Sequence, residues 1–132
     1  MIDHGIETED ERVEKTKPHK GKIKVNFKSN VKSFEIFIQD DGRGIDPKVI
    51  KNKVLEKGLK SEKDLENLKD SDFINMIFLP GFSTKKEVTD ISGRGIGMDA
   101  LKEEVQKLGG TVSVSSRINE GTTFLIKLPF FN

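Results

Sequence analysis

Residues 93–97 read Gly-Arg-Gly-Ile-Gly and come directly before a predicted helix. Met98, Leu101 and Val105 recur at helical spacing after them, and two glycines at 109–110 end the pattern. Glycines before a helix let the backbone approach a ligand, and the free N–H groups and helix dipole favour an anion such as a phosphate. A flexible helix start without a ligand is the alternative. The stretch is no dinucleotide fingerprint, because no strand precedes it, and no P-loop, because no Gly-Lys-Ser/Thr closes it.

Residues 40–44 read Asp-Asp-Gly-Arg-Gly and lie between a predicted strand and a predicted helix. A carboxylate at a strand end can accept hydrogen bonds from a ligand, and glycines leave room for a flat ring against the turn. The segment is no EF-hand, because its acidic residues do not recur at alternate positions up to a closing glutamate. Taken alone, it is equally compatible with an ordinary acidic turn.

The segment that leads into the glycine stretch shows neither helical nor strand periodicity between Pro80 and Ser92. An aperiodic segment of this length between ordered elements is often a mobile functional loop. We therefore predict that residues 80–97 form a lid hinged on glycine beside a phosphate site.

Alternation of apolar and polar residues predicts four strands in two hairpins, at residues 22–28, 33–39, 111–115 and 122–128. Helical signals predict helices over 47–57 with Asp46 as N-cap, over 64–68 after a capping box, over 72–78 with Ser71 as N-cap, and over 98–108. For residues 1–14 we predict the end of a helix followed by a charged turn. For residues 15–21 we predict a solvated basic connector. Each strand has one apolar face, so the predicted fold is an α/β two-layer sandwich, an open, mainly antiparallel sheet covered by helices on one face.

Length and composition limit the function classes. The chain has 132 residues, 23 basic against 22 acidic, and no cysteine. One domain with its own core is expected, and the near-zero net charge gives no argument for a nucleic-acid or membrane partner. Disulfides and cysteine chemistry are excluded, and two histidines are too few for a histidine-based metal site. The apolar run at 73–79 is too short to span a bilayer and the N-terminus is no signal peptide, so we expect a cytoplasmic protein.

Five motifs occur in one order along the whole chain: Asp-His-Gly-Ile-Glu at 3–7, Asp-Asp-Gly-Arg-Gly-Ile-Asp at 40–46, Pro-Gly-Phe-Ser-Thr at 80–84, Gly-Arg-Gly-Ile-Gly-Met-Asp at 93–99 and Gly-Thr-Thr-Phe at 121–124. Together they resemble the ATP-binding catalytic domain of histidine kinases, above all chemotaxis kinases of the CheA type. This family has the Bergerat fold, which it shares with gyrase, MutL and the Hsp-ninety chaperones. The resemblance implies one ATP-binding domain over residues 1–132 with a mixed, mainly antiparallel sheet.

The resemblance also implies site residues. Asp40 would accept a hydrogen bond from the adenine amine, with Gly44 beside it and Thr122 in the same network. Ile45, Ile77 and Met98 would line the base, and His4 would approach the phosphates or the metal from the first helix. The remaining residues expected around the nucleotide are Gly42, Lys53, Ser83, Thr84, Gly93, Arg94, Gly95, Ile96 and Gly97. For Lys53 and Arg94, an ordinary solvated cation stays an equal alternative.

The chain departs from the family pattern at its beginning. The family carries an asparagine that ligates magnesium three residues before the Asp-His pair, and a histidine one helical turn earlier. Both positions lie before residue 1, so we expect an incomplete first helix and no metal ligand within the chain. The bare apolar sheet surface that this leaves predicts a homo-oligomer, formed by self-association or by swapping of the N-terminal segment.

The predicted function is therefore that of a histidine kinase catalytic domain, with ATP and Mg²⁺ as cofactors. The full enzyme would transfer the γ-phosphoryl group to a histidine on a separate phosphoacceptor domain and work with a response regulator. The alternative is a nucleotide- or protein-binding module without catalysis. A hydrolase of the gyrase or MutL type is disfavoured, because those proteins carry a glutamate base in the missing helix and have different lids.

Overall fold

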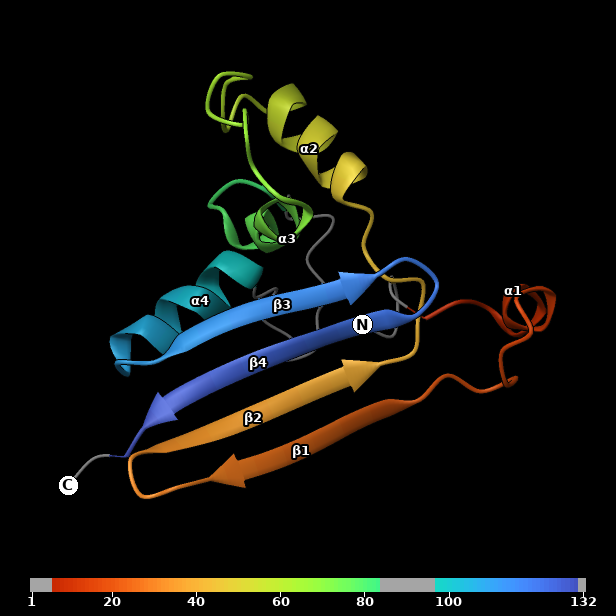
Figure 1. Cartoon of the computed structure of the whole chain (residues 1–132), viewed down its shortest axis with the longest axis horizontal. Helices are drawn as coiled ribbons and strands as arrows, with labels where there is room; N and C mark the ends of the chain where they lie inside the picture. The colour runs from red at the N-terminus through yellow and green to blue at the C-terminus, as the bar shows by residue number, and fades with distance from the viewer. Residues whose placement is uncertain (1–5, 84–96, 131–132) are drawn as a thin grey trace.

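A computed structural model describes residues 6–83 and 97–130, and in this part of the chain four strands form one sheet (Figure 1). The strands are β1 (Ile23–Ser29), β2 (Ser33–Asp40), β3 (Thr111–Arg117) and β4 (Gly121–Pro129), in the order β1-β2-β4-β3. Every described pairing is antiparallel. The four predicted strands and the two hairpins are confirmed.

Two helices begin where the sequence predicts and end one residue earlier than predicted. In α2 (Pro47–Glu56), Asp46 is the N-cap and its side chain accepts the N–H of Lys48 at 2.9 Å. The helix α4 (Met98–Lys107) begins after Gly97. Gly58 and Gly109 follow the two helices with positive φ angles of 67° and 79°, which end a helix at little steric cost in glycine.

The segment between α2 and α4 differs from the prediction. Residues 62–67 form turns instead of a helix, although Ser61 and Asp64 do make the hydrogen bonds of a capping box. The left-handed backbone of Asn67, with φ of 64°, is incompatible with a continuing helix. Ser71 is not the next N-cap, because α3 (Asp70–Ile74) begins one residue before it and has Lys69 as its N-cap. A 3-10 turn, η1 (Asn75–Phe78), completes this region.

The N-terminal segment contains a short helix, α1 (Glu9–Glu14), whose N-cap is Thr8. It stands beside the end of the sheet where β2 ends and β3 ends, away from the other helices (Figure 1). The connector that follows is not uniformly solvated, since the ammonium group of Lys17 is mostly buried and ion-paired. That part of the prediction was wrong.

The core lies on one face of the sheet, over β3 and β4. Buried side chains of α3, η1 and α4 pack on Val112 and Val114 of β3, and half-buried Phe124 and Ile126 of β4 border them. A second cluster joins α2, α3 and the residues after them. Helices on one face are confirmed, but they cover only the β3 half (Figure 1). Strand β1 was predicted to be half-buried, and all of its residues are exposed.

Candidate functional site

Asp40 ends β2 and stands at the centre of the predicted adenine site. Its Oδ1 atom accepts the N–H of Gly42 at 2.9 Å and the N–H of Thr122, at the start of β4, at 3.2 Å. The other oxygen, Oδ2, makes no hydrogen bond to the described residues. Two backbone donors therefore fix the carboxylate, and one of its oxygens keeps the capacity to accept from a ligand.

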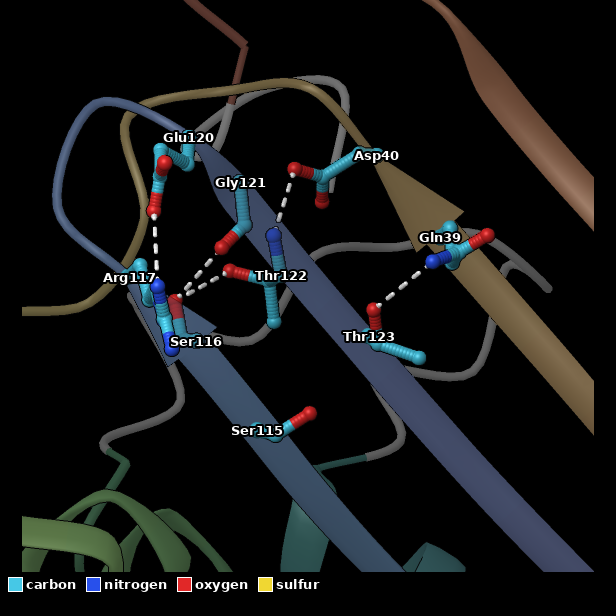
Figure 2. Close-up of a pocket in the computed structure, with 9 residues that line it drawn as sticks. All are labelled: Gln39, Asp40, Ser115, Ser116, Arg117, Glu120, Gly121, Thr122 and Thr123. Atoms are coloured by element: carbon cyan, nitrogen blue, oxygen red, sulfur yellow. Dashed lines mark hydrogen bonds and ion pairs between the residues drawn. The ribbon is translucent and has the colours of Figure 1, made fainter.

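The turn that follows Asp40 is attached to the β3–β4 hairpin. Ser116 Oγ accepts the N–H of Ile45 at 2.8 Å, contacts the carbonyl of Gly121 at 2.9 Å and lies 2.8 Å from the hydroxyl of Thr122. Figure 2 shows Ser116 pointing toward Gly121 and Thr122, with Asp40 bonded to the same strand. Sequence reasoning missed Ser116, because its only local signal is a polar residue in an alternating strand.

The two segments approach each other so closely that glycine is required on both sides. Gly44 has a φ of 76°, and an added Cβ there would collide with the carbonyl oxygen of Arg117. An added Cβ at Gly121 would likewise collide with the carbonyl oxygen of Asp40. Predicted Gly42 is buried and donates to Asp40. Gly44 and Gly121 thus serve the close approach of backbone to backbone.

The three residues predicted to line the base are brought together. Ile45, Ile77 and Met98 come from the acidic turn, η1 and the first residue of α4, and all three pack against the cluster over β3. Each remains partly exposed. These residues therefore supply partly exposed apolar surface of the kind that a site for a flat aromatic ring requires. Gly97, the N-cap of α4, directly precedes Met98.

The predicted phosphate ligand Lys53 lies at the base of the predicted lid. Its ammonium group sits 4.5 Å from the ring centroid of Phe82, a cation–π contact. Lys57 Nζ donates to the carbonyl of Phe82 at 2.5 Å. Ser83 directly follows Phe82 and is half-buried. Lys53 and Lys57 thus both contact Phe82, where the predicted lid begins. Lys53 is therefore not a purely solvated cation.

The second carboxylate of the acidic turn, Asp41, belongs to a buried ion-pair cluster with Glu7, Arg12 and Lys17. Arg12 donates to Glu7 Oε1 at 3.1 Å and to Asp41 Oδ2 at 2.7 Å, and the side chains of Arg12 and Glu7 are 0% exposed. Lys17 Nζ pairs with Glu7 Oε2 at 2.5 Å. No sequence signal identified this cluster, because its members are spread over 35 positions.

The electrostatics of the cluster favour the ionised carboxylates. Burial raises the pKa of Glu7, but the hydrogen bond and charge of Lys17 and the charge of Arg12 outweigh it, so the pKa lies below its ordinary value. The pKa of Asp41 is also lowered, because the N–H of Lys22 and the guanidinium of Arg12 outweigh the effect of burial. Both groups therefore stay charged at neutral pH.

An open cavity of about 420 Å³ lies at this end of the sheet (Figure 2). By strand register, Ser115, Thr123 and Gln39 lie on the sheet face opposite to Ser116 and Thr122. The cavity is therefore lined by residues from both faces of the sheet. It does not by itself mark the predicted adenine site, whose residues Asp40 and Thr122 lie on the helix-covered face.

Other predicted site residues lie outside the described residues: His4, Thr84, Gly93, Arg94, Gly95 and Ile96. Across residues 6–83 and 97–130 no group of three or more histidine or acidic side chains is placed to hold a metal ion. Within the same residues no helix is long and apolar enough to cross a membrane.

Comparison with known proteins identifies relatives over the whole chain. The family described as "Histidine kinase-, DNA gyrase B-, and HSP90-like ATPase" matches residues 1–132. The chemotaxis protein CheA of Borreliella burgdorferi is 49% identical over 128 residues, which is 97% of this chain and 15% of that protein. The sensor histidine kinase CheAY of Helicobacter pylori is 44% identical over 96% of this chain and 16% of that protein.

CheA of Bacillus subtilis is 44% identical over 97% of this chain and 19% of its own length. The chain therefore spans less than a fifth of each of these three relatives. Among solved structures, the mycobacterial sensor histidine kinase MprB has 24% identity and a TM-score of 0.48, over 85% of this chain and 60% of that one.

Proposed function

The chain belongs to the family of histidine kinase-, DNA gyrase B- and HSP90-like ATPases, and from this premise we propose that it is the ATP-binding catalytic domain of a CheA-like histidine kinase. Residues 1–132 form this domain. The full enzyme transfers the γ-phosphoryl group of ATP to a histidine on a separate phosphoacceptor domain in chemotaxis signalling, and a response regulator then receives it. The observation that carries the proposal is the Asp40 carboxylate, which two backbone N–H groups fix, in a chain 49% identical to the CheA protein of Borreliella burgdorferi.

At the adenine end, Asp40 Oδ2 accepts a hydrogen bond from the exocyclic amine while Oδ1 stays bonded to Gly42 and Thr122. Ile45, Ile77 and Met98 supply the apolar surface for the ring. A buried acceptor that loses its donor is costly, so this arrangement selects a base that carries an amine.

At the phosphate end, the backbone N–H groups before α4 and the positive end of its dipole face the nucleotide. Lys53 leaves the Phe82 ring, where it now lies at 4.5 Å, and pairs with phosphate oxygens when the lid closes. The residues proposed to complete this end are Ser83, Thr84, Gly93, Arg94, Gly95, Ile96 and Gly97, with His4 approaching from the N-terminal side.

The chemistry requires no nucleophile of this chain. A nitrogen of the acceptor imidazole attacks the γ-phosphorus, the bond to the β–γ bridging oxygen breaks, and ADP leaves. The domain positions the reacting groups and neutralises charge on the phosphates. Closure of the lid excludes water, which would otherwise attack the γ-phosphorus and hydrolyse ATP. Magnesium bound to the phosphates would neutralise their charge, and no step here depends on it.

The proposal is tested by titrating the chain with ATP and by changing Asp40→Asn. The amide keeps the shape but places a donor or a weaker acceptor against the adenine amine, so affinity is expected to fall at least about tenfold. Asp46→Asn is the matched control, because asparagine caps a helix as well as aspartate does. Equal ATP affinity of Asp40→Asn and the unmodified chain would refute the assignment.

A non-catalytic nucleotide- or protein-binding module is the second candidate, since the family's magnesium-ligating asparagine has no counterpart within the chain. The two are separated by supplying Mg-ATP and a phosphoacceptor domain. A kinase binds ATP more tightly with magnesium and phosphorylates the acceptor, whereas a module shows magnesium-independent binding and no phosphorylation. We also propose a cytoplasmic location, without nucleic acid as a partner.

A further inference from the structure

The buried ion-pair cluster of Glu7, Arg12, Lys17 and Asp41 holds the backbone of the acidic turn as well as its side chain. Lys17 Nζ donates to the carbonyl oxygens of Asp41 at 2.9 Å and of Gly42 at 2.7 Å. Arg12 Nη1 also donates to the carbonyl of Asp41 at 3.3 Å. Two cations therefore converge on a single peptide group, the one that joins Asp41 to Gly42.

That peptide group connects the cluster to the Asp40 carboxylate. The carbonyl of Asp41 and the N–H of Gly42 belong to the same peptide plane, and in a trans peptide they point in opposite directions. Cations that hold the carbonyl on one side therefore aim the N–H to the other side. There it donates to Asp40 Oδ1 at 2.9 Å.

The N-terminal segment supplies both cations and keeps them in place. Glu7 bridges Arg12 and Lys17 through its two oxygens, and Arg12 Nε donates to the carbonyl of Pro18 at 2.6 Å. A third cation, the more exposed Lys15, also lies 3.8 Å from Glu7 Oε2. Removing one member of such a buried set leaves an uncompensated charge, which is far more costly than the pair is worth by itself.

We propose that Arg12 and Lys17 are positioning residues for adenine recognition, acting through the Asp41–Gly42 peptide on the Asp40 carboxylate. The inference rests on the proposed function, in which Asp40 reads the adenine amine. Its distinct content is that residues of the N-terminal segment, none of which lines the proposed base site, set the preference for adenine. A cluster that only holds the fold together would change stability without changing that preference.

The test compares ATP with ITP, whose hypoxanthine ring carries a carbonyl where adenine carries the amine. In the unmodified chain ATP binds more tightly than ITP. Lys17→Met removes both carbonyl contacts and is expected to reduce the ITP-to-ATP ratio of dissociation constants by about tenfold. Lys17→Arg restores a cation with several donors and is expected to retain most of the ratio.

The matched control is Glu11→Gln, which removes a charge from the same helix, α1. Glu11 pairs with Arg43 at 3.1 Å, but both side chains are 44% exposed, so its loss should leave the ratio unchanged. Arg12→Met is the stronger variant. If this variant fails to fold, Lys17→Met still tests the proposal, because the Lys17 side chain is 14% exposed whereas that of Arg12 is fully buried.

A second measurement needs no nucleotide. Amide hydrogen exchange of Gly42 is expected to accelerate at least about tenfold in Lys17→Met relative to the amides of β3 and β4, because its N–H loses its fixed direction. Absence of ATP binding by the unmodified chain would refute the proposed function. An unchanged nucleotide ratio in a chain that does bind ATP, or unchanged exchange of Gly42, would overturn the positioning role alone.

Discussion

At the residue scale, hydroxyl and glycine positions define how the acidic turn meets the β3–β4 hairpin. Ser116 bonds to the backbone of Ile45 and of Gly121, and Gly44 allows the approach to Arg117. Neither role depends on side-chain charge. Both make the geometry of the candidate adenine site sensitive to the loss or gain of one or two atoms.

Ser116→Ala tests the hydroxyl. It leaves the partly buried N–H of Ile45 without its acceptor, so the free energy of unfolding is expected to fall by about 1–3 kcal/mol in urea denaturation. Ser115→Ala is the control, because Ser115 is exposed on the opposite sheet face and its change should stay within about 0.5 kcal/mol. Equal losses in the two variants would contradict the role of Ser116.

Gly44→Ala and Gly58→Ala separate steric collision from backbone conformation. Both glycines have positive φ, at 76° and 67°, so both changes carry a penalty of about 1–2 kcal/mol. Only at Gly44 does the added Cβ meet the carbonyl of Arg117, whereas nothing lies within 4 Å of it at Gly58. Denaturation curves should show Gly44→Ala as clearly the less stable variant. Similar stabilities would mean that the two segments separate at little cost.

At the element scale, α1 and the connector after it are held to the end of β2 by charge rather than by apolar packing. The helix has six residues, too few to be stable by itself, and its buried residue is Arg12. Its attachment thus depends on the ionised forms of Glu7 and Asp41. This makes the attachment sensitive to acid.

Stability is therefore expected to fall in acid. The pKa values of Glu7 and Asp41 are lowered in the folded chain. Their stabilising contribution is complete above the unfolded-state pKa of about 4 and is lost as the pH falls through the folded-state values. Urea midpoints measured between about pH 7 and about pH 3 check this. Asp41→Asn should be less stable at neutral pH and show a shallower dependence, and parallel curves for the two proteins would contradict it.

At the scale of the whole molecule, the uneven coverage of the sheet is the main feature. The face that packs against α4 over β3 continues across β2 to β1, where Ile23, Val25 and Phe27 are 41%, 50% and 64% exposed. Phe27 stacks on Phe34 at 5.6 Å between ring centroids. Apolar surface of this extent is typical of an interface.

The isolated 132-residue chain is therefore expected to self-associate through this face. Light scattering should give a molar mass above that of the monomer, rising with concentration. Phe27→Lys should shift the chain toward monomer, whereas Val31→Ser should not, because Val31 is 95% exposed in the β1–β2 turn rather than on the face. A clean monomer at high concentration would show that the face does not drive association.

The sequence by itself determined the elements whose signals are local. Alternation predicts the four strands, and Asp46 and Gly109 mark helix ends, because capping and periodicity depend on neighbours along the chain. The ordered motifs also identified the family and pointed to Asp40. The turns at 62–67 escaped prediction because a capping box starts a helix without providing the packing that continues it.

Only the tertiary structure decided which charges are buried and which apolar residues are not. Arg12 and Lys17 look like solvated cations in a basic, polar segment, yet the fold places both against Asp41. Phe27 looks like a core residue in an alternating strand, yet no described helix reaches β1. Both outcomes depend on contacts between distant segments, and no local pattern encodes which segments meet.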